Sequence, residues 1–427
     1  MGNIRILLLL LIPAIPSFAQ DTVRMTLAEC LDYSFRHNVD IRTARLSQEN
    51  AVLSLEAAKL KFTPTLTATA GENWNMQDGN NSRNGSYGIN AGMTLFSGFS
   101  NLNNYRQSKI ALASSKAQVE QSANTVGAKI IESYLTILMN SEKLSYQEEV
   151  VHCSYEQMME ARTKWEVGKM LESDYLLLEA NHNNARVTME NTALTIANNM
   201  IALRTLMGCD SVVDVIPLNH VFSDTTIAPL DSVKARAMRS MPDYVISDLD
   251  VEHARYGVKL AKSAYLPTLS VSAGSSHYGG HSGQLNSSGS VISTDGVSTN
   301  FGVNLSLPIF NQGTHRTQLK QNKINLQQAE INRQQTLRTL NQQIEGQYLS
   351  TRQALNQYHS AAKLQQAYKA SYDTYAAKYA EGMVTTVAML QQQDQYLSAT
   401  NDYLQSKYSF LLSRMVLDIY TGNNTNK

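Results

Sequence analysis

Histidines, cysteines and carboxylates are the side chains most able to do chemistry, and they are scattered along this 427-residue chain. The nine histidines form no His-Glu-x-x-His motif, and no Gly-x-x-x-x-Gly-Lys phosphate loop occurs. His277 and His281 come nearest to metal-ligand spacing, but they lie in a Gly/Ser-rich stretch with no nearby carboxylate pair. A solvated loop is the simpler interpretation. The sequence therefore predicts neither an enzyme nor a bound metal or cofactor.

The three cysteines and the overall charge exclude further classes. Cys30, Cys153 and Cys209 are odd in number and far apart, so they predict no disulfide framework. The 36 Lys and Arg balance the 36 Asp and Glu, and no basic block occurs in the sequence. This balance argues against nucleic acid as a partner.

The N-terminus indicates export. Within residues 1–19, Arg5 precedes an apolar run from Ile6 to Ile12, and small residues lead to Ala19. This pattern predicts a secretory signal cleaved after Ala19, with a retained anchor as the alternative. No later apolar run approaches the roughly 18 residues of a membrane-spanning helix. A β-barrel is the other way in which an exported chain enters a membrane.

The elements that position the remaining candidate residues form an internal duplication. The stretch from Gly98 to Gly208 is helical in pattern and is broken near its middle by Gly168. The same pattern recurs from Gly313 to Gly422, with its break at Gly382. A constant offset of 214 positions (382 minus 168) relates the two copies. Each copy is predicted to be a pair of long helices folded into a hairpin.

Shorter helices precede each hairpin. Thr26 and Glu29 have capping-box spacing, which predicts a helix to about His37 and a second helix from Val39 to about residue 62. Their counterparts begin near Leu230 and resume after Pro242. Here the offset is 203 positions (243 minus 40), so 11 extra residues (214 minus 203) must lie in the second copy before its hairpin.

Two strand-like segments lie between these helices in each copy. Residues 65–74 and 87–95 alternate apolar and polar side chains, and residues 268–278 and 300–308 repeat the alternation. Residues 78–86 and 279–300 are rich in Gly, Asn and Ser and are predicted to be loops.

The two faces of these predicted strands indicate a membrane barrel. One face is apolar, and the other carries Gly, Ser, Thr and Asn in place of charged residues, as suits a water-filled lumen. A soluble sheet packed on the helices is the alternative. Four strands cannot close a membrane barrel, because the smallest need about eight. A membrane-inserted chain would therefore have to oligomerise.

The long helices are predicted to pack side by side. The helix from Phe99 to Val167 would extend on the order of 100 Å at about 1.5 Å per residue. Several helices carry two apolar seams, which indicates two neighbours per helix, as in a cylinder. The clearest heptad seam comprises Val387, Leu390, Asp394, Leu397, Asn401, Leu404, Tyr408, Leu411 and Met415.

These features resemble the TolC family of outer-membrane efflux channels. The resemblance rests on the duplicated order from Thr26 to Gly422. It includes a Pro-Thr-Leu entry into each strand pair, at residues 64–66 and 267–269, and an exit at residues 95–98 and 309–313. The fold class it implies is mainly α with a small membrane β-barrel portion, built as a trimeric tunnel.

The resemblance also implies the surroundings of the chain. It implies a homotrimer in outer-membrane lipid, with a large periplasmic portion that docks onto a periplasmic adaptor protein and, through it, an inner-membrane pump. The domains would be a first repeat at 20–208, an equatorial linker at 209–229, a second repeat at 230–422 and a tail at 423–427. The expected function is passage of small molecules or polypeptides to the exterior. A soluble periplasmic coiled-coil scaffold or adaptor is the alternative.

Carried over by position, the resemblance assigns two kinds of site. The residues of the periplasmic tips, which would dock the adaptor, are Val167, Gly168, Lys169, Glu381, Gly382 and Met383. The residues of the closed gate are Ser173, Asp174 and Tyr379, with the Tyr379 hydroxyl donating to the Asp174 carboxylate.

The chain departs from the family pattern around this gate. Val384 stands where the family uses an arginine, and the acidic ring of the constriction falls on the neutral Ala388 and Gln391. Asp394, one turn further, is the nearest acidic substitute, although its heptad position favours a place in a helical seam.

Overall fold

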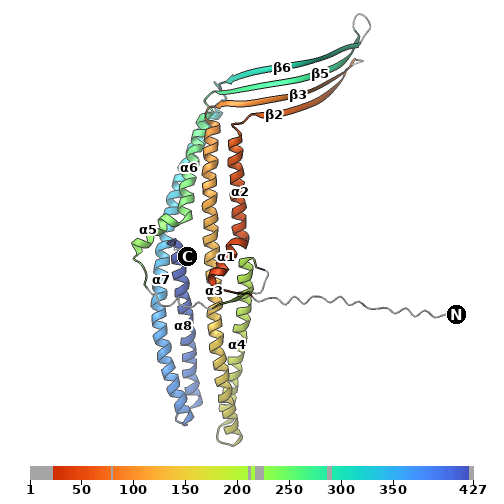
Figure 1. Cartoon of the computed structure of the whole chain (residues 1–427). Helices are drawn as coiled ribbons and strands as arrows, with labels where there is room; N and C mark the ends of the chain where they lie inside the picture. Colours follow the sequence, from red (N-terminus) through yellow and green to blue (C-terminus); the bar gives the residue numbers. More distant parts are fainter. Residues whose placement is uncertain (1–22, 78–79, 210–212, 217–225, 286–290, 423–427) are drawn as a thin grey trace, which may run out of the picture.

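A computed structural model describes residues 23–77, 80–209, 213–216, 226–285 and 291–422 (Figure 1). The expected signal peptide, the tail at 423–427 and part of the expected linker lie outside these residues. A long helical body carries a sheet that leaves one end of it at an angle. The helices are α1 (Leu27–His37), α2 (Val39–Leu60), α3 (Ser100–Glu166), α4 (Glu172–Met207), α5 (Leu230–Ser240), α6 (Pro242–Ser263), α7 (Thr314–Ala380) and α8 (Thr386–Tyr420).

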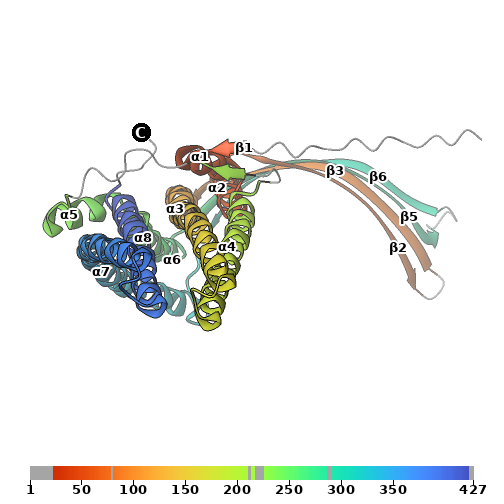
Figure 2. The ribbon, with the colours of Figure 1, turned by 90° about the horizontal axis from the view of Figure 1, so that it is seen from below.

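The helices α3 and α7 are the two long staves of the body. Each contains 67 residues, so at about 1.5 Å per residue each extends on the order of 100 Å, as the sequence predicted. In the half near the sheet, α2 packs on α3, and α6 packs between α3 and α7. In the other half, α4 pairs with α3 and α8 pairs with α7 (Figure 2). None of the described helices is both long and apolar enough to cross a membrane.

Local signals at the helix ends behave as the sequence predicted. The Thr26 hydroxyl accepts a hydrogen bond from the Glu29 backbone N–H at 3.3 Å, and the Thr26 N–H donates to the Glu29 carboxylate at 2.7 Å. This confirms the capping box at the start of α1. Pro242 occupies the first turn of α6, where its missing N–H costs no helical hydrogen bond.

Four antiparallel strands form one sheet in the order β2-β3-β5-β6. Their bounds are β2 (Thr65–Gln77), β3 (Asn80–Ser97), β5 (Thr268–Leu285) and β6 (Val291–Ser306). The strands are longer than predicted, and most of the two predicted loops is strand. Gly, Asn and Ser weaken the apolar alternation there, but the backbone ladder between neighbouring strands continues through them. At its other end β6 stops at Ser306, short of the predicted residue 308.

The register gives the sheet two chemically different faces. Leu66, Ala91, Ala273 and Phe301 are paired across the four strands, so they form one apolar row. The adjacent row holds Thr67, Asn90, Gly274 and Asn300 and faces the other way. The alternation that the sequence predicted is therefore present in the structure. The apolar face is open to its surroundings, with Leu66 74% and Phe301 84% exposed.

The main core lies where the two halves of the helical body meet. Residues of α1, α3, α4 and α8 form it around the fully buried Tyr134. The short strands β1 (Val23–Met25) and β4 (Val213–Val215) pair in parallel beside this core. The Tyr134 hydroxyl donates to the Ile216 carbonyl, which attaches the β4 segment to α3. This strand pair was not predicted from the sequence.

Candidate functional site

The two hairpin tips have the same backbone geometry. Gly168 and Gly382 have φ angles of 71° and 75°, in the left-handed region that glycine adopts without strain. At the first tip, the Gly168 N–H donates to the Trp165 carbonyl at 2.8 Å and the Lys169 N–H to the Lys164 carbonyl at 2.8 Å. The second tip repeats both bonds from Gly382 and Met383, at 2.9 Å and 2.8 Å. Both long helices therefore end in a Schellman motif.

Apolar side chains surround both tips. Val167 and Leu171 are exposed at the first tip, and Met383 and Val387 are exposed at the second. Beneath them, a small buried cluster of Ala161, Leu178 and Met389 joins the two hairpins. The tips are thus fixed by their backbone and by this cluster, while their outer side chains stay available to a partner.

The predicted gate residues lie next to this cluster but are not bonded to one another within one chain. Tyr379 is half-buried and packs against the cluster, Asp174 is half-buried at the start of α4, and Ser173 is exposed. Between the described atoms of Asp174 and Tyr379 there is no hydrogen bond. The next residue after Asp174, Tyr175, stacks on Trp165 with ring centroids 5.2 Å apart, and its hydroxyl donates to the Glu179 carboxylate at 3.3 Å. The bond predicted for the gate stays a prediction for contacts between chains.

A partly buried polar contact ties the two hairpins together further from the tips. Lys407 Nζ on α8 lies 2.8 Å and 2.6 Å from the two carboxylate oxygens of Glu142 on α3. The Tyr408 hydroxyl donates to the same carboxylate at 2.9 Å. Burial, and then the bond to Glu142, raise the pKa of Tyr408, so the hydroxyl keeps its proton and stays a donor. Sequence reasoning missed this contact, because its partners are 265 positions apart.

A cavity of about 260 Å³ lies between this contact and the tips, where α3 meets α4 and α8. Lys143 and Asp394 line it together with several asparagines, and burial raises the pKa of Asp394. Tyr146 and Gln147 also line it, and each has a buried polar atom that finds no hydrogen-bond partner among the described residues. Asp394 therefore borders a groove with polar lining rather than filling an apolar seam.

One of the two histidines with metal-like spacing, His277, has structural partners. His277 Nε2 lies 2.9 Å from the Asp295 carboxylate, and the Tyr87 ring lies 4.8 Å from the His277 ring. Both histidines are on β5, within a strand and not in the predicted loop. Within the part of the chain that the structure describes, no three His, Cys, Asp or Glu side chains gather as metal ligands would.

The two edges of the described chain carry unpaired strands and exposed apolar residues. Among the described strands, β2 and β6 each have a partner on one side only. Two helices at the β2 side carry exposed apolar residues at steps of seven: Val39, Leu46, Leu53 and Leu60 on α2, and Val187, Leu194 and Ile201 on α4. At the β6 side, α7 exposes Ile324 and Ile331 with the same step. The step of seven is that of coiled-coil seams.

Comparisons with known proteins agree with this architecture. The model of the outer membrane efflux protein family matches residues 33–209 and 236–423. The chain is 21% identical over 315 residues to the outer membrane efflux protein BepC of Brucella suis biovar 1, covering 73% of this chain and 66% of BepC. It is 23% identical over 305 residues to the alkaline protease secretion protein AprF of Pseudomonas aeruginosa, covering 69% of this chain and 60% of AprF. The matches thus span less than two thirds of each curated relative.

Solved structures share the fold. The structure of CusC matches with a TM-score of 0.79 at 16% identity, over 92% of this chain and 91% of that one. The CmeC outer membrane channel of Campylobacter jejuni matches with a TM-score of 0.77 at 22% identity, over 93% and 85%. The mainly helical architecture with a four-stranded sheet is therefore shared with outer-membrane channels. Because the family model matches most of its length, the chain belongs to the outer membrane efflux protein family, and it is located in the outer membrane with a large helical part in the periplasm.

Proposed function

We propose that this chain forms the outer-membrane channel of a tripartite efflux or export system. Three copies would enclose one tunnel from the periplasm to the exterior. The proposal rests on the family and above all on one observation, the complementary unpaired edges of the single chain. The family consists of channel proteins, so the chain is proposed to conduct its cargo without catalysis.

The sheet edges require a partner in a membrane. Each backbone group left unpaired in hydrocarbon costs several kcal/mol, so the outer edges of β2 and β6 must be satisfied. Pairing β6 of one copy with β2 of the next satisfies both. Two copies would give about eight strands, whose interior is filled by side chains, whereas three give about twelve and leave an open lumen. A homotrimer is therefore the smallest assembly that leaves a lumen.

The helical edges match in the same way. Counted from the sheet, Leu53 of α2 lies near the level of Ile324 of α7, and Leu46 lies near the level of Ile331. Both helices rise about 1.5 Å per residue, so the two seams stay in step. Leu46 is 60% and Ile331 65% exposed in the single chain. We assign these seams to the contact between neighbouring copies, where burial of the four side chains would stabilise the trimer.

The tips and the gate take their proposed roles in this trimer. The apolar side chains around Gly168 and Gly382 suit a periplasmic adaptor protein, which would link the channel to an inner-membrane pump. Tyr379 of one copy would donate to Asp174 of the next and hold the tunnel closed. Val384, Ala388 and Gln391 are neutral, so they add no charged contact to the closed gate. The bond between Tyr379 and Asp174 would therefore contribute a larger share of the stability of the closed state than it would in a gate held by a charged network.

A soluble periplasmic scaffold or adaptor is the second candidate. It accounts for the helical hairpins, but it gives no use for an exposed apolar sheet face that backs a polar face of Gly, Asn, Ser and Thr. An exposed apolar surface of that extent suits lipid rather than water. The channel is therefore the better supported function.

Fractionation combined with cross-linking tests the channel. In a background with the three native cysteines replaced by serine, Leu46→Cys together with Ile331→Cys should give a covalent trimer in the outer-membrane fraction. Leu46→Cys with Leu364→Cys is the matched control, because Leu364 is an exposed α7 residue in the other half of the body. Recovery of a soluble monomer without cross-links would contradict the proposal.

A further inference from the structure

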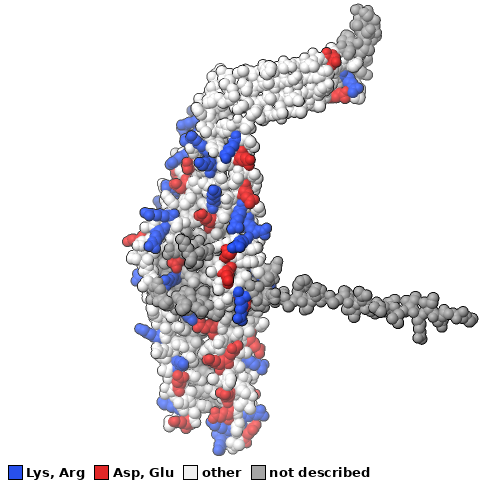
Figure 3. All heavy atoms as spheres, viewed as in Figure 1, with Lys and Arg blue, Asp and Glu red and all other residues white. Residues whose placement is uncertain are grey.

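The helix ends beneath the sheet carry a strong excess of positive charge. Eleven Lys and Arg lie in residues 57–64, 98–119, 253–267 and 307–329, and these four segments contain no Asp or Glu. We call these eleven side chains the basic belt: Lys59, Lys61, Arg106, Lys109, Lys116, Arg255, Lys259, Lys262, Arg316, Lys320 and Lys323. The other Lys and Arg number 25 (36 minus 11), against 36 Asp and Glu. Lys and Arg are therefore enriched at the end of the helical body that carries the sheet, while both signs of charge are mixed over the rest of it (Figure 3).

The belt is arranged as stripes along the helices. On α6, Arg255, Lys259 and Lys262 follow at steps of four and three, so they share one face of the helix. Gly257 and Ala261, which are buried, lie on the opposite face. On α7, the three belt residues are spaced in the same steps. The charges are therefore directed away from the packing between helices.

All the belt side chains are open to their surroundings. Each of the eleven is exposed, and within the described residues none of them forms an ion pair. Lys259 Nζ lies 4.2 Å from the centroid of the Tyr256 ring, a cation–π contact that leaves its charge uncompensated. A surface of this kind is complementary to an anionic partner.

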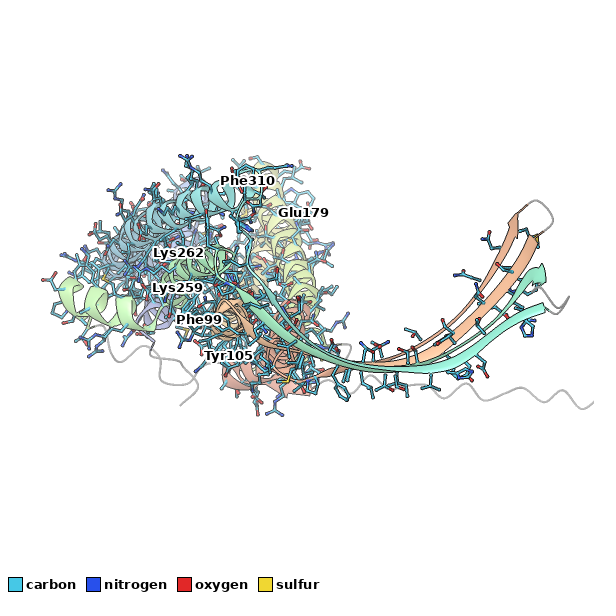
Figure 4. The ribbon with its side chains drawn as sticks, turned by 90° about the horizontal axis from the view of Figure 1, so that it is seen from above. Phe99, Tyr105, Glu179, Lys259, Lys262 and Phe310 are labelled. Carbon is cyan, nitrogen blue, oxygen red and sulfur yellow. The ribbon has the colours of Figure 1, made fainter. Side chains whose placement is uncertain are left out.

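Aromatic side chains lie between the belt and the sheet. Phe310 is 85% exposed, and Phe62, Phe99 and Tyr265 are also exposed at the junctions of helix and strand. Figure 4 shows Phe99, Phe310, Lys259 and Lys262 around the point where the strands leave the helices. Beyond them, the sheet presents its apolar face. The order from sheet to helix is thus apolar, aromatic, cationic, which is the order met across a lipid leaflet.

We propose that the basic belt binds the phosphate groups of anionic phospholipids in the leaflet of the outer membrane that faces the periplasm. This inference rests on the proposed membrane insertion of the sheet. It goes beyond it by naming a lipid class and the residues that recognise it. The attraction falls off over a Debye length of about 10 Å at 0.1 M salt. Lys61 and Lys262, close to the strands, therefore contribute most, and Lys116, about 24 Å from the start of α3, contributes least.

A reconstitution experiment tests the inference. The full trimer is placed in vesicles of neutral phosphatidylcholine alone or with about a third of phosphatidylglycerol, and its dissociation temperature is read from gels. Phosphatidylglycerol should raise that temperature by several degrees in dilute buffer, and the increment should vanish at about 0.5 M salt. The combined variant K61Q, K259Q, K262Q and R316Q should lose most of the increment.

Matched controls separate charge from fold. The variant R338Q, R352Q, K363Q and K369Q removes the same charge from exposed α7 positions away from the sheet and should keep the increment. Replacing Lys61, Lys259 and Lys262 by Arg should also keep it. If the belt variant is too unstable to assemble, the salt and lipid dependence of the unaltered protein still decides.

Each of the following outcomes would overturn the inference. Equal stabilisation by both vesicles, or an unchanged increment in the belt variant, would show that the belt does not recognise lipid charge. A belt variant that keeps the increment but shifts the reversal potential of the channel would assign these cations to anionic cargo in the lumen. Failure to insert into either vesicle would contradict the proposed function as well, whereas insertion indifferent to lipid charge contradicts only the lipid inference.

Discussion

The long helices α3 and α7 are equal in length and related by the duplication, yet the single chain buries them very differently. Helix α3 contacts α1, α2, α4, α6 and α8, and buried residues occur along its whole length. Helix α7 contacts α5, α6 and α8 and buries only Leu340, Ile344, Thr351, Ala354 and Ala361. The difference follows from position, because α7 lies at an edge of the chain and α3 lies at its centre.

The positions that are buried in both helices show what the duplication kept. Val126 and Ile130 of α3 correspond to Leu340 and Ile344 of α7 at the offset of 214 (340 minus 126), and all four are buried. These are the sites against which the short helices α1 and α5 pack, in the first and second halves respectively. What α7 lacks is a cover for the rest of its apolar residues. A neighbouring copy would provide that cover.

Truncating the equivalent core residues should give the largest difference between the two halves. Ile130→Ala is expected to destabilise the protein by about 4 kcal/mol and Ile344→Ala by about 2 kcal/mol, both within the usual range for such cavities. Ile130 lies in the large central cluster, which cannot collapse into a cavity, whereas Ile344 lies in a small cluster at the periphery. Denaturant unfolding of the purified protein measures both changes. Equal costs would mean that the assembled trimer packs α7 as tightly as the chain packs α3.

A smaller effect is expected where the two hairpins meet at the gate. A hydrogen bond between the Tyr379 hydroxyl and the Asp174 carboxylate would favour the closed state by about 2 kcal/mol. Tyr379→Phe and Asp174→Ala should each raise single-channel conductance, and the double variant should add little to either. Tyr375→Phe, one turn earlier on α7, is the control and should leave conductance unchanged. Unchanged conductance in all variants would leave Tyr379 with only its packing role beside Met389.

Features set by local sequence were predictable. The glycines at both tips, the capping box of α1 and the helix boundaries near them depend on a few adjacent residues, and the structure places each as expected. The two faces of the strands were also predictable, because alternation of side chains is itself local. The symmetry of the two halves was therefore available from the sequence.

Features that depend on distant pairing were not predictable. The ends of the strands depend on the backbone ladder with a neighbour, the Glu142–Lys407 contact joins residues 265 positions apart, and β4 pairs with β1 at the far end of the first repeat. The basic belt was hidden for the same reason, because its residues run from Lys59 to Lys323 in four separate segments. The asymmetry between α3 and α7 belongs to this second group, since it arises only from three-dimensional placement.

The tips are where the two halves should be energetically alike, and small substitutions can show whether they are. Gly168→Ala and Gly382→Ala should each destabilise the protein by about 1 kcal/mol, because alanine is strained at their positive φ angles although nothing lies within 4 Å of the added Cβ. Gly346→Ala, inside α7 and equally free of neighbours, is the control and should stabilise by about 0.5–1 kcal/mol. Denaturant unfolding measures the three changes. A cost at one tip well above that at the other would mean that the two tips differ beyond their shared Schellman geometry, and that only one of them is held by further contacts in the trimer.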